Sequence, residues 1–319
     1  MSMQNRVKLY TLKNMFIFCV TAYANVFANQ LSAQEIVIAF QDTLSPSTTL
    51  DGTARTKMLI RNMARADVKQ AMFLIRTKTI TPKTVERMMF YDETGQLIVN
   101  AGHSYSPLNA SKSFGYPIDI MKANVALEDY ENYHKHVFFP YLYDGRNAEL
   151  LEQLQHYLAE HNYSPTYATT RVHDEYMNHL YHERVAVGRS VDIRQLEKAY
   201  TKMIVDAVTA YDAKAHTVLG FSPRQVLLLH ENDIAAYCIV GAIDALNAKG
   251  FKVIAPEKVF TDPVANPFFV SGFSAVSYMP YITGIPDSEY EWNQVATKKD
   301  EAKINSYLIE QGLESLIPQ

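Results

Sequence analysis

The chain has 319 residues, of which 48% are hydrophobic, 12% aromatic and 20% charged. This composition is typical of a globular protein with a sizeable core and excludes a disordered chain. No linker rich in Pro, Gly or Ser divides the sequence, so we expect one large domain. The formal net charge of −4 argues against nucleic acid and anionic lipid as partners.

The first 33 residues have the pattern of a secretory signal peptide. Three basic residues and no acid accompany an apolar run over residues 15–28, which ends in small residues. Cleavage after Ala28 or after Ala33 fits equally well. The run of roughly 14 apolar residues is shorter than the ~20 that span hydrocarbon. We therefore expect an exported protein, periplasmic or secreted, with no stable membrane span; without residues 1–33 its net charge is −7.

The two cysteines exclude an intrachain disulfide in the exported chain. Cys19 lies inside the predicted signal peptide, and Cys238 lies in an apolar stretch. A lone cysteine in such a stretch is more often an inert core thiol than a nucleophile.

Strand and helix patterns alternate along the rest of the chain. Helical periodicity is clearest over 192–215, where apolar residues form a continuous stripe, and strand character is clearest over 225–230. This alternation predicts a parallel sheet, closed or doubly wound. The expected strands are 35–40, 71–75, 97–99, 167–172, 225–230 and 251–254, and the expected helices are 53–66, 81–91, 148–161, 192–215, 234–249 and 299–310.

Polar residues that follow the apolar runs are the candidates for chemistry, because parallel sheets place functional groups at the carboxyl ends of their strands. They are residues 41–42, residues 102–104, Asp174 and His230. Aspartates and histidines that converge from several strands suggest hydrolysis around a divalent metal. Each position also has a structural explanation, since an aspartate often caps a helix and a histidine is often only hydrogen-bonded.

Several segments resemble the NodB-homology polysaccharide deacetylases, of the carbohydrate esterase family 4 type. Residues 36–42 (IVIAFQD) resemble their first strand and paired aspartates, and residues 102–109 (GHSYSPLN) their metal-binding histidine segment. Residues 138–142 (FFPYL) are similar to their Arg-x-Pro-Tyr motif, and residues 226–263 to the late histidine region of an exported bacterial subgroup. The likeness follows the family order over about residues 35–265.

The resemblance implies an α/β fold, the deformed (β/α) barrel of the NodB/polysaccharide deacetylase type, over residues 34–265. Residues 266–319 would be a C-terminal extension packed on the barrel. The implied activity is removal of N-acetyl groups from an amino-sugar polymer by a metal-dependent hydrolase of non-peptide C–N bonds. In that family a zinc-like divalent ion polarises the amide and water, a carboxylate takes the water proton, and a histidine protonates the leaving amine.

Four family roles are carried over to residues of this chain. Asp42 matches the metal-binding aspartate and His103 the first metal-binding histidine. His230 matches the general acid, and Asp174 matches the acid expected beside that histidine.

Three other family positions are degenerate here. Gln41 stands where the base is expected, and a neutral amide cannot accept a proton near neutral pH. Phe138 replaces the arginine that orients the base, and Ser106 runs directly into Pro107, where the family has a metal-binding histidine before the proline. Loss of the base alone costs about 10²- to 10⁴-fold in rate, and two ligands bind a divalent ion weakly.

Two functions therefore compete. The first is a weakened deacetylase that binds a divalent metal and acts on an N-acetylated polysaccharide or oligosaccharide. The second is a catalytically inactive glycan-binding or scaffold protein on the same barrel, with no metal. The histidine- and acid-rich stretch 173–183 could rebuild a site, but a solvated helix surface is the simpler interpretation.

Overall fold

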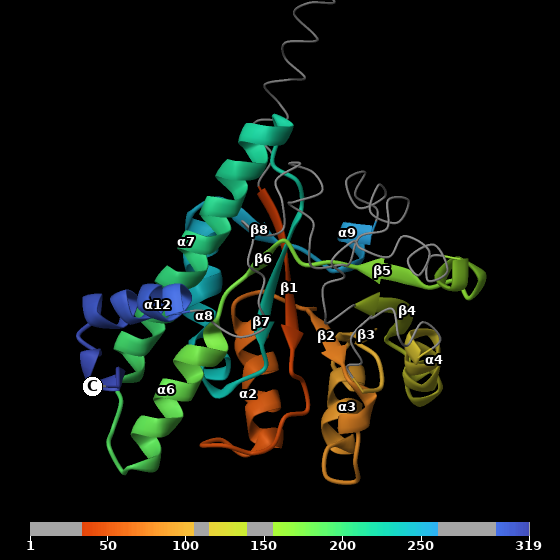
Figure 1. Cartoon of the computed structure of the whole chain (residues 1–319), viewed down its shortest axis with the longest axis horizontal. Coiled ribbons are helices and arrows are strands. Elements are labelled where there is room, and N and C mark those ends of the chain that lie inside the picture. Colours follow the sequence, from red (N-terminus) through yellow and green to blue (C-terminus); the bar gives the residue numbers. More distant parts are fainter. Residues whose placement is uncertain (1–33, 105–114, 139–155, 261–297, 319) are drawn as a thin grey trace, which may run out of the picture. The chain divides into compact units, whose positions relative to one another are not determined.

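The computed structural model describes residues 34–104, 115–138, 156–260 and 298–318 (Figure 1). Residues from Glu35 onward belong to one compact unit. The strands are β1 (Gln34–Gln41), β2 (Met72–Ile75), β3 (Leu97–Asn100), β4 (Tyr133–Phe138), β5 (Ser164–Thr166), β6 (Thr170–Arg171), β7 (Gln225–His230) and β8 (Phe251–Val253). The helices are α2 (Gly52–Arg65), α3 (Val85–Glu93), α4 (Gly115–Leu127), α6 (Asp174–Ala186), α7 (Ile193–Leu219), α8 (Asp233–Ala248), α9 (Glu257–Phe260) and α12 (Lys298–Glu310), with 3₁₀ turns η1 (Thr77–Thr79) and η4 (Glu314–Leu316).

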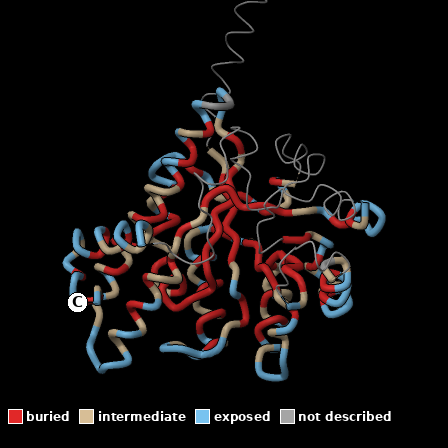
Figure 2. Tube along the Cα trace, in the orientation of Figure 1, coloured by how far each residue is buried: buried red, intermediate tan, exposed pale blue. Residues whose placement is uncertain are grey.

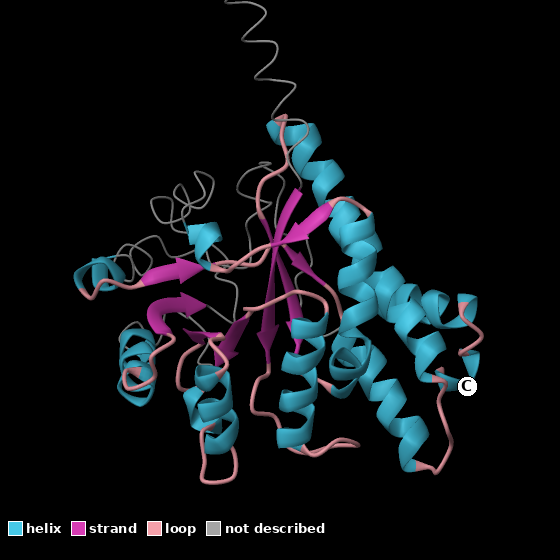
Figure 3. Ribbon diagram, turned by 180° about the vertical axis from the view of Figure 1, so that it is seen from behind, coloured by secondary structure: helices cyan, strands magenta, loops and turns pink. Residues whose placement is uncertain are grey.

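The strands form one curled sheet in the order β5-β4-β3-β2-β1-β7-β6, with β8 also paired to β1. Neighbours along this order pair in parallel. Helices surround the sheet (Figures 1 and 3). The predicted deformed (β/α) barrel is therefore confirmed, and within the described strands it stays open between β5 and β6.

Strand β1 lies near the middle of the sheet and is buried on both faces, as its unbroken apolar sequence predicts. Alternate side chains enter two core clusters: Ile36, Ile38 and Phe40 join one, and Val37 and Ala39 join the other. The first cluster packs against residues of α2, α7 and α8. Figure 2 shows the sheet buried and the outer surfaces of the helices exposed.

The two central helices begin where side chains cap them. Asp192 accepts hydrogen bonds from the backbone N–H groups of Arg194 and Gln195 at the start of α7. Asn232 accepts one from Ala235 at the start of α8. Helix α7 ends at Leu219, and the next residue, Gly220, has a φ of 77°, in the left-handed region that glycine adopts readily. The apolar stripe predicted over 192–215 is buried in the core as expected.

Helix α3 and strand β6 differ from the sequence-based prediction. Helix α3 begins at Val85 rather than at residue 81, because the Thr84 hydroxyl accepts from the Thr81 N–H and donates to the Thr79 carbonyl. Such local bonds compete with helix formation. The strand expected over 167–172 is reduced to the two residues of β6.

The C-terminal helix α12 covers part of α7. Its residues Ile304, Tyr307 and Leu308 are buried, and the Lys202 ammonium of α7 lies 5.5 Å from the centre of the Tyr307 ring. The helix predicted over 299–310 is confirmed. Residues 1–33 and 261–297 lie outside the described residues, so the signal peptide and the domain boundary at residue 265 stay predictions. Among the described helices, none is long and apolar enough to cross a membrane.

Candidate functional site

The carboxyl ends of β1 and β7 bring Gln41 and His230 together. The two residues are partners in the parallel register, and Gln41 Nε2 lies 2.7 Å from His230 Nε2. The next residue, Asp42, has a φ of 50°. Its Oδ2 lies 3.9 Å from His230 Nε2, and 56% of its side chain is exposed. The end of β1 thus places an amide against the imidazole and a carboxylate on the solvent side of it.

Asp174 fixes the other side of the His230 ring. It is the first residue of α6 and is fully buried. Its Oδ1 accepts from His230 Nδ1 at 2.6 Å. Its Oδ2 accepts from the His230 backbone N–H and from Asn232 Nδ2, both at 3.1 Å. The bond at Nδ1 turns Nε2 toward the strand ends. Two of the predicted site residues, Asp174 and His230, therefore form a buried acid–imidazole pair.

A second histidine and carboxylate lie behind this pair. Glu175 Oε2 is 3.4 Å from His230 Nδ1, and Glu175 Oε1 is 2.7 Å from His173 Nδ1. Only 12% of the His173 side chain and 29% of the Glu175 side chain are exposed, whereas His179 is 63% exposed. The prediction of a solvated helix surface over 173–183 is therefore wrong for the start of α6, where Asp174 is fully buried and Asp300 of α12 lies 3.5 Å from His173.

The charges around His230 favour its protonated form. Burial lowers the pKa of His230, but the charge and hydrogen bond of Asp174 and the charges of Glu175 and Asp42 outweigh burial and raise the pKa above its ordinary value. Burial raises the pKa of Glu175, yet its bond to His173 and nearby positive charges lower the pKa overall. When His230 is protonated, a half-turn of the Gln41 amide presents Oε1 as an acceptor for the Nε2 proton.

His103 follows the end of β3, and its hydrogen bonds go to residues outside the cluster of His230, Asp174 and Glu175. Its Nδ1 is 3.0 Å from Thr77 Oγ1, and its backbone N–H donates to Asp119 Oδ2 at 2.8 Å. Gly102 has a φ of 82°, and a side chain there would collide with the Asp119 carboxylate. Strand β2 lies between β1 and β3, so His103 and Asp42 follow strands that are not neighbours.

The predicted metal ligands do not assemble a three-ligand site within the described residues. The one group of three ligand-type side chains found there is Asp174, Glu175 and His230, whose ligand atoms lie within 4.8 Å of one another. Their hydrogen bond at 2.6 Å already occupies Asp174 Oδ1 and His230 Nδ1. Asp42 and His103 supply two ligands, fewer than zinc takes from proteins. A metal at these two residues stays a prediction.

Of the two other positions predicted to be degenerate, the structure describes only one. Phe138 ends β4 and is 2% exposed, packed in the core cluster of Val37 and Ala39. The residue predicted to replace the family's arginine is therefore an apolar ring in the core. Pro107 lies outside the described residues.

A buried polar network that the sequence-based analysis did not identify lies beneath the site. Glu231 follows His230 directly and is fully buried. Its Oε1 accepts from Arg87 Nη2 at 2.9 Å and from the Thr56 hydroxyl, and its Oε2 accepts from the Tyr91 hydroxyl at 2.5 Å. Burial and the Glu231 charge raise the pKa of Tyr91, so this hydroxyl stays a donor.

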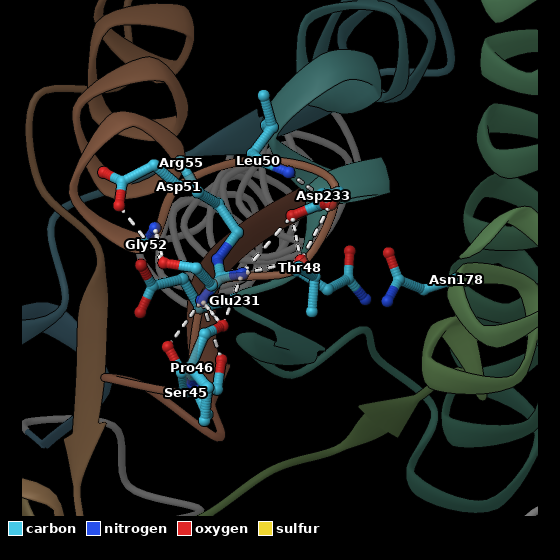
Figure 4. A network of polar contacts seen from close by, with 12 residues as sticks. Ser45, Pro46, Thr48, Leu50, Asp51, Gly52, Arg55, Asn178, Glu231 and Asp233 are labelled. Atoms are coloured by element: carbon cyan, nitrogen blue, oxygen red, sulfur yellow. Dashed lines mark hydrogen bonds and ion pairs between the residues drawn. The ribbon is translucent and has the colours of Figure 1, made fainter. Parts of the chain in front are cut away.

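Asp233 anchors the second half of the network, seen from close by in Figure 4. It forms an ion pair with Arg55 at 3.3 Å, accepts from the Thr48 hydroxyl at 2.9 Å, and lies 2.9 Å from His182 Nε2. Arg55 also donates to the Ser45 carbonyl at 2.8 Å. The two acids therefore tie the loop after β7 to the loop after β1, which carries Asp42. The sequence signal for this network was the run of polar residues directly after the apolar run 226–229 of β7.

Comparison with known proteins finds similarity in structure only. No protein-family model and no curated protein matches the sequence. Among solved structures, a family 4 acetyl xylan esterase from Clostridium thermocellum, in complex with a cobalt ion, is 14% identical with a TM-score of 0.45, over 71% of this chain and 90% of that one. A Streptococcus mutans CE4 esterase is 15% identical with a TM-score of 0.48, over 73% and 90%. A CE4 family pseudoenzyme from Bacillus anthracis is 10% identical with a TM-score of 0.47, over 72% and 66%.

All three are proteins of carbohydrate esterase family 4. This is the family that the sequence motifs resemble, and the likeness is one of fold.

Proposed function

We propose that this chain is a slow deacetylase of an N-acetylated polysaccharide or oligosaccharide, with His230 as the proton donor. The observation that carries the proposal is the buried pair of His230 and Asp174, which leaves Nε2 directed at the carboxyl ends of β1 and β7. The substrate class rests on the motif resemblance. The slow rate rests on Gln41, which cannot serve as the base.

The chain's own residues supply an acid and a candidate base. Hydrolysis of an N-acetyl group breaks the carbonyl C–N bond, and the leaving amine must gain a proton. A protonated His230 gives its Nε2 proton to that nitrogen, while Asp174 stabilises the imidazolium and holds its orientation. Asp42 Oδ2, 3.9 Å from Nε2 and exposed, is the carboxylate placed to take the proton of the attacking water. No step of this scheme uses a metal ion, because the group of three ligand-type side chains found among the described residues includes neither Asp42 nor His103.

Acetate release from N-acetylglucosamine oligomers tests the proposal. We expect slow turnover that falls by about 10²- to 10⁴-fold in His230→Gln, because general acid catalysis is lost. His179→Gln is the matched control, since it makes the same change on the exposed face of α6. Equal acetate release by wild type and His230→Gln would contradict a catalytic role for this histidine.

A glycan-binding protein without hydrolysis is the second candidate, and one observation favours it. Gln41 Nε2 lies 2.7 Å from His230 Nε2, so a neutral amide covers the nitrogen that would donate the proton. This candidate predicts that calorimetry detects binding of N-acetylglucosamine oligomers although no acetate appears. Turnover that disappears in His230→Gln would exclude it.

Metal content tests the cofactor separately. Because the described residues bring only Asp42 and His103 as the predicted ligands, we expect less than one zinc per chain after dialysis against metal-free buffer. Elemental analysis of wild type and His103→Ala measures this directly. One equivalent of zinc that is retained by wild type and lost in His103→Ala would show that a complete site forms.

A further inference from the structure

We propose that Glu231 and Thr43 are positioning residues that hold residues 42–44, directly after β1, in a strained backbone conformation, and that this conformation keeps the Asp42 carboxylate beside His230. The effect on turnover rests on the proposed function, in which Asp42 takes the proton of the attacking water. The effect on the backbone does not, so the two effects are tested separately.

Two residues of this segment have a backbone conformation that L-amino acids rarely adopt. Asp42 has a φ of 50° and Leu44 a φ of 61°. Aspartate enters the left-handed region several times more often than most residues, so Asp42 alone would need no special cause. Leucine has no polar side-chain atom to stabilise this region, and its Cβ is crowded there. Leu44, whose side chain is buried in the main core cluster, therefore carries strain that the surrounding structure holds in place.

Glu231 fixes the backbone on both sides of Asp42. Its backbone N–H donates to the Gln41 carbonyl at 3.0 Å, and its Oε2 accepts from the Leu44 N–H at 3.3 Å. The side chain is fully buried and is itself held by Arg87 at 2.9 Å. Because the acceptor is charged and shielded from water, its bond to Leu44 is stronger than a bond between neutral groups.

Thr43 fixes the middle of the segment. It is 3% exposed, and its hydroxyl donates to the Leu74 carbonyl of β2 at 2.8 Å. The Ser45 carbonyl, directly after the segment, accepts from Arg55 Nη2 at 2.8 Å (Figure 4) and from Arg87 Nη1 at 2.7 Å. Contacts from β2, α2 and α3 therefore specify one conformation of the chain here.

Asp42 is the exception within this fixed segment. Its side chain is 56% exposed, and its Oδ2 lies 3.9 Å from His230 Nε2, beyond hydrogen-bond distance. The direction of the carboxylate therefore depends on the backbone that carries it. A loop that only reverses the chain can use glycine at a left-handed position without strain. Strain that is kept at Leu44, beside candidate catalytic groups, is the pattern of a positioned site.

Glu231→Gln separates positioning from general stability. The remaining side-chain oxygen is expected to stay with the Arg87 guanidinium, so the NH₂ group faces the Leu44 N–H and the Tyr91 hydroxyl. A hydroxyl can turn and accept, whereas a backbone N–H cannot, so the variant loses the bond to Leu44. Tyr91→Phe is the matched control, because it removes the other bond to the same oxygen and leaves the bond to Leu44.

NMR spectroscopy of the full chain tests the backbone effect without any substrate. A positive φ brings the amide and Hα protons of one residue close together, which gives a strong intraresidue NOE. In Glu231→Gln we expect this NOE to weaken at Asp42 and Leu44, and the Leu44 amide to exchange at least about tenfold faster. Thr43→Val keeps the side-chain shape and removes the hydroxyl, so it should give a smaller change of the same kind. Tyr91→Phe should keep the wild-type NOEs.

Acetate release from N-acetylglucosamine oligomers tests the effect on turnover. We expect kcat to fall by about 10²-fold in Glu231→Gln with KM little changed, because the carboxylate is displaced while the binding surface is not. Tyr91→Phe should keep the wild-type kcat. An equal fall of kcat in Tyr91→Phe would show that the loss of network stability, and not of position, lowers turnover, and would overturn the catalytic part of the proposal.

The two measurements together decide the remaining cases. Wild-type NOEs at Asp42 and Leu44 in Glu231→Gln, or in Thr43→Val if Glu231→Gln does not fold, overturn the positioning role. If the NOEs weaken while no protein releases acetate, wild type included, the positioning role stands and the proposed deacetylase fails. If the NOEs weaken in Glu231→Gln and its kcat equals that of an active wild type, the position of Asp42 does not limit turnover, and the catalytic part is overturned.

Discussion

His230 has a hydrogen-bond partner at each ring nitrogen, and the two partners differ in charge. Asp174 at Nδ1 favours the imidazolium, which is the form that donates a proton. Gln41 at Nε2 is neutral and can meet either form by turning its amide. Residue 41 therefore decides whether Nε2 has a charged side chain within hydrogen-bond distance, in addition to the Asp42 carboxylate 3.9 Å away.

Gln41→Asp should raise the pKa of His230. A carboxylate beside Nε2 stabilises the imidazolium, and we expect a rise of about one unit or more by NMR titration. The same change supplies a base, so acetate release should increase if Gln41 limits the rate. Gln41→Asn is the control because it has the size of aspartate without its charge. An unchanged His230 pKa in Gln41→Asp would mean that residue 41 does not face Nε2.

His136 should make the protein sensitive to acid. Burial, and then the charge of His134, lower the pKa of His136 to about 4, and its ring stacks on Phe260 at 3.6 Å. A lowered pKa means that the unfolded chain binds the proton first, so stability is full above the ordinary pKa of ~6.5 and falls as the pH drops toward 4. The loss is about 3 kcal/mol at most.

His136→Phe keeps the stacked ring and removes the titration. Urea unfolding at pH 7.5 and 4.5 should show a smaller loss of stability in this variant than in wild type. His179→Gln, which changes an exposed histidine, should behave like wild type. Equal pH dependence in all three proteins would contradict the assignment to His136.

At the scale of elements, two ion pairs that involve α3 differ greatly in burial. Arg87 of α3 and Glu231 are 2% and 0% exposed, and Thr56 of α2 bonds to the same carboxylate. Lys57 of α2 and Glu86 of α3 form a pair at 2.7 Å that is 32% and 64% exposed. Only the first pair is protected from water, so only its loss leaves an uncompensated charge in the interior.

Glu231→Leu should destabilise the fold by about 3–5 kcal/mol, because it leaves Arg87 buried without its partner. The double variant Arg87→Leu/Glu231→Leu should lose less than the sum of the two single variants. Urea unfolding of the four proteins forms a double-mutant cycle. The same cycle on Lys57 and Glu86 should give a coupling of at most ~1 kcal/mol. Additive losses at Arg87 and Glu231 would show that the pair contributes nothing through its interaction.

The elements that the sequence predicted well are those that the core specifies. β7 is apolar from Val226 to Leu229 and buried throughout, and its predicted range agrees with the structure residue by residue. β6 is only two residues long, which is too short for a periodic pattern. α4 exposes Ile118, Met121 and Val125, and this obscures the amphipathic stripe that marks a helix.

The site could be predicted only at residues that the motif resemblance to the family covers. Asp174 and His230 were expected together, and the structure places them in contact. The contact of His173 with Asp300 joins residues that are far apart in the chain, and it depends on how α12 packs on α7. No local pattern contains that information. The buried pair of Arg87 and Glu231 was not predicted for the same reason.

At the scale of the whole molecule, the compact unit begins where the predicted signal peptide ends. β1 starts at Gln34, directly after Ala33, and the compact unit starts at Glu35. Glu35 pairs with Arg224 at 2.5 Å, and Ile36 accepts a hydrogen bond from Ile254 at the start of the sheet. A chain that begins at Gln34 would keep these contacts, whereas a cut within β1 would remove them.

We propose export with removal of residues 1–33 or 1–28, and mass spectrometry of the protein from a bacterial periplasm tests it. The expected first residue is Gln34 or Asn29. Because signal peptidases need a small residue before the cut, Ala33→Leu should abolish the first product and Ala28→Leu the second. A chain expressed from Gln34 should unfold in urea at the same midpoint as the exported protein, since the described contacts of β1 begin there. Intact residues 1–33 in the periplasmic protein, or a lower midpoint for the chain from Gln34, would show that the first 33 residues belong to the folded protein.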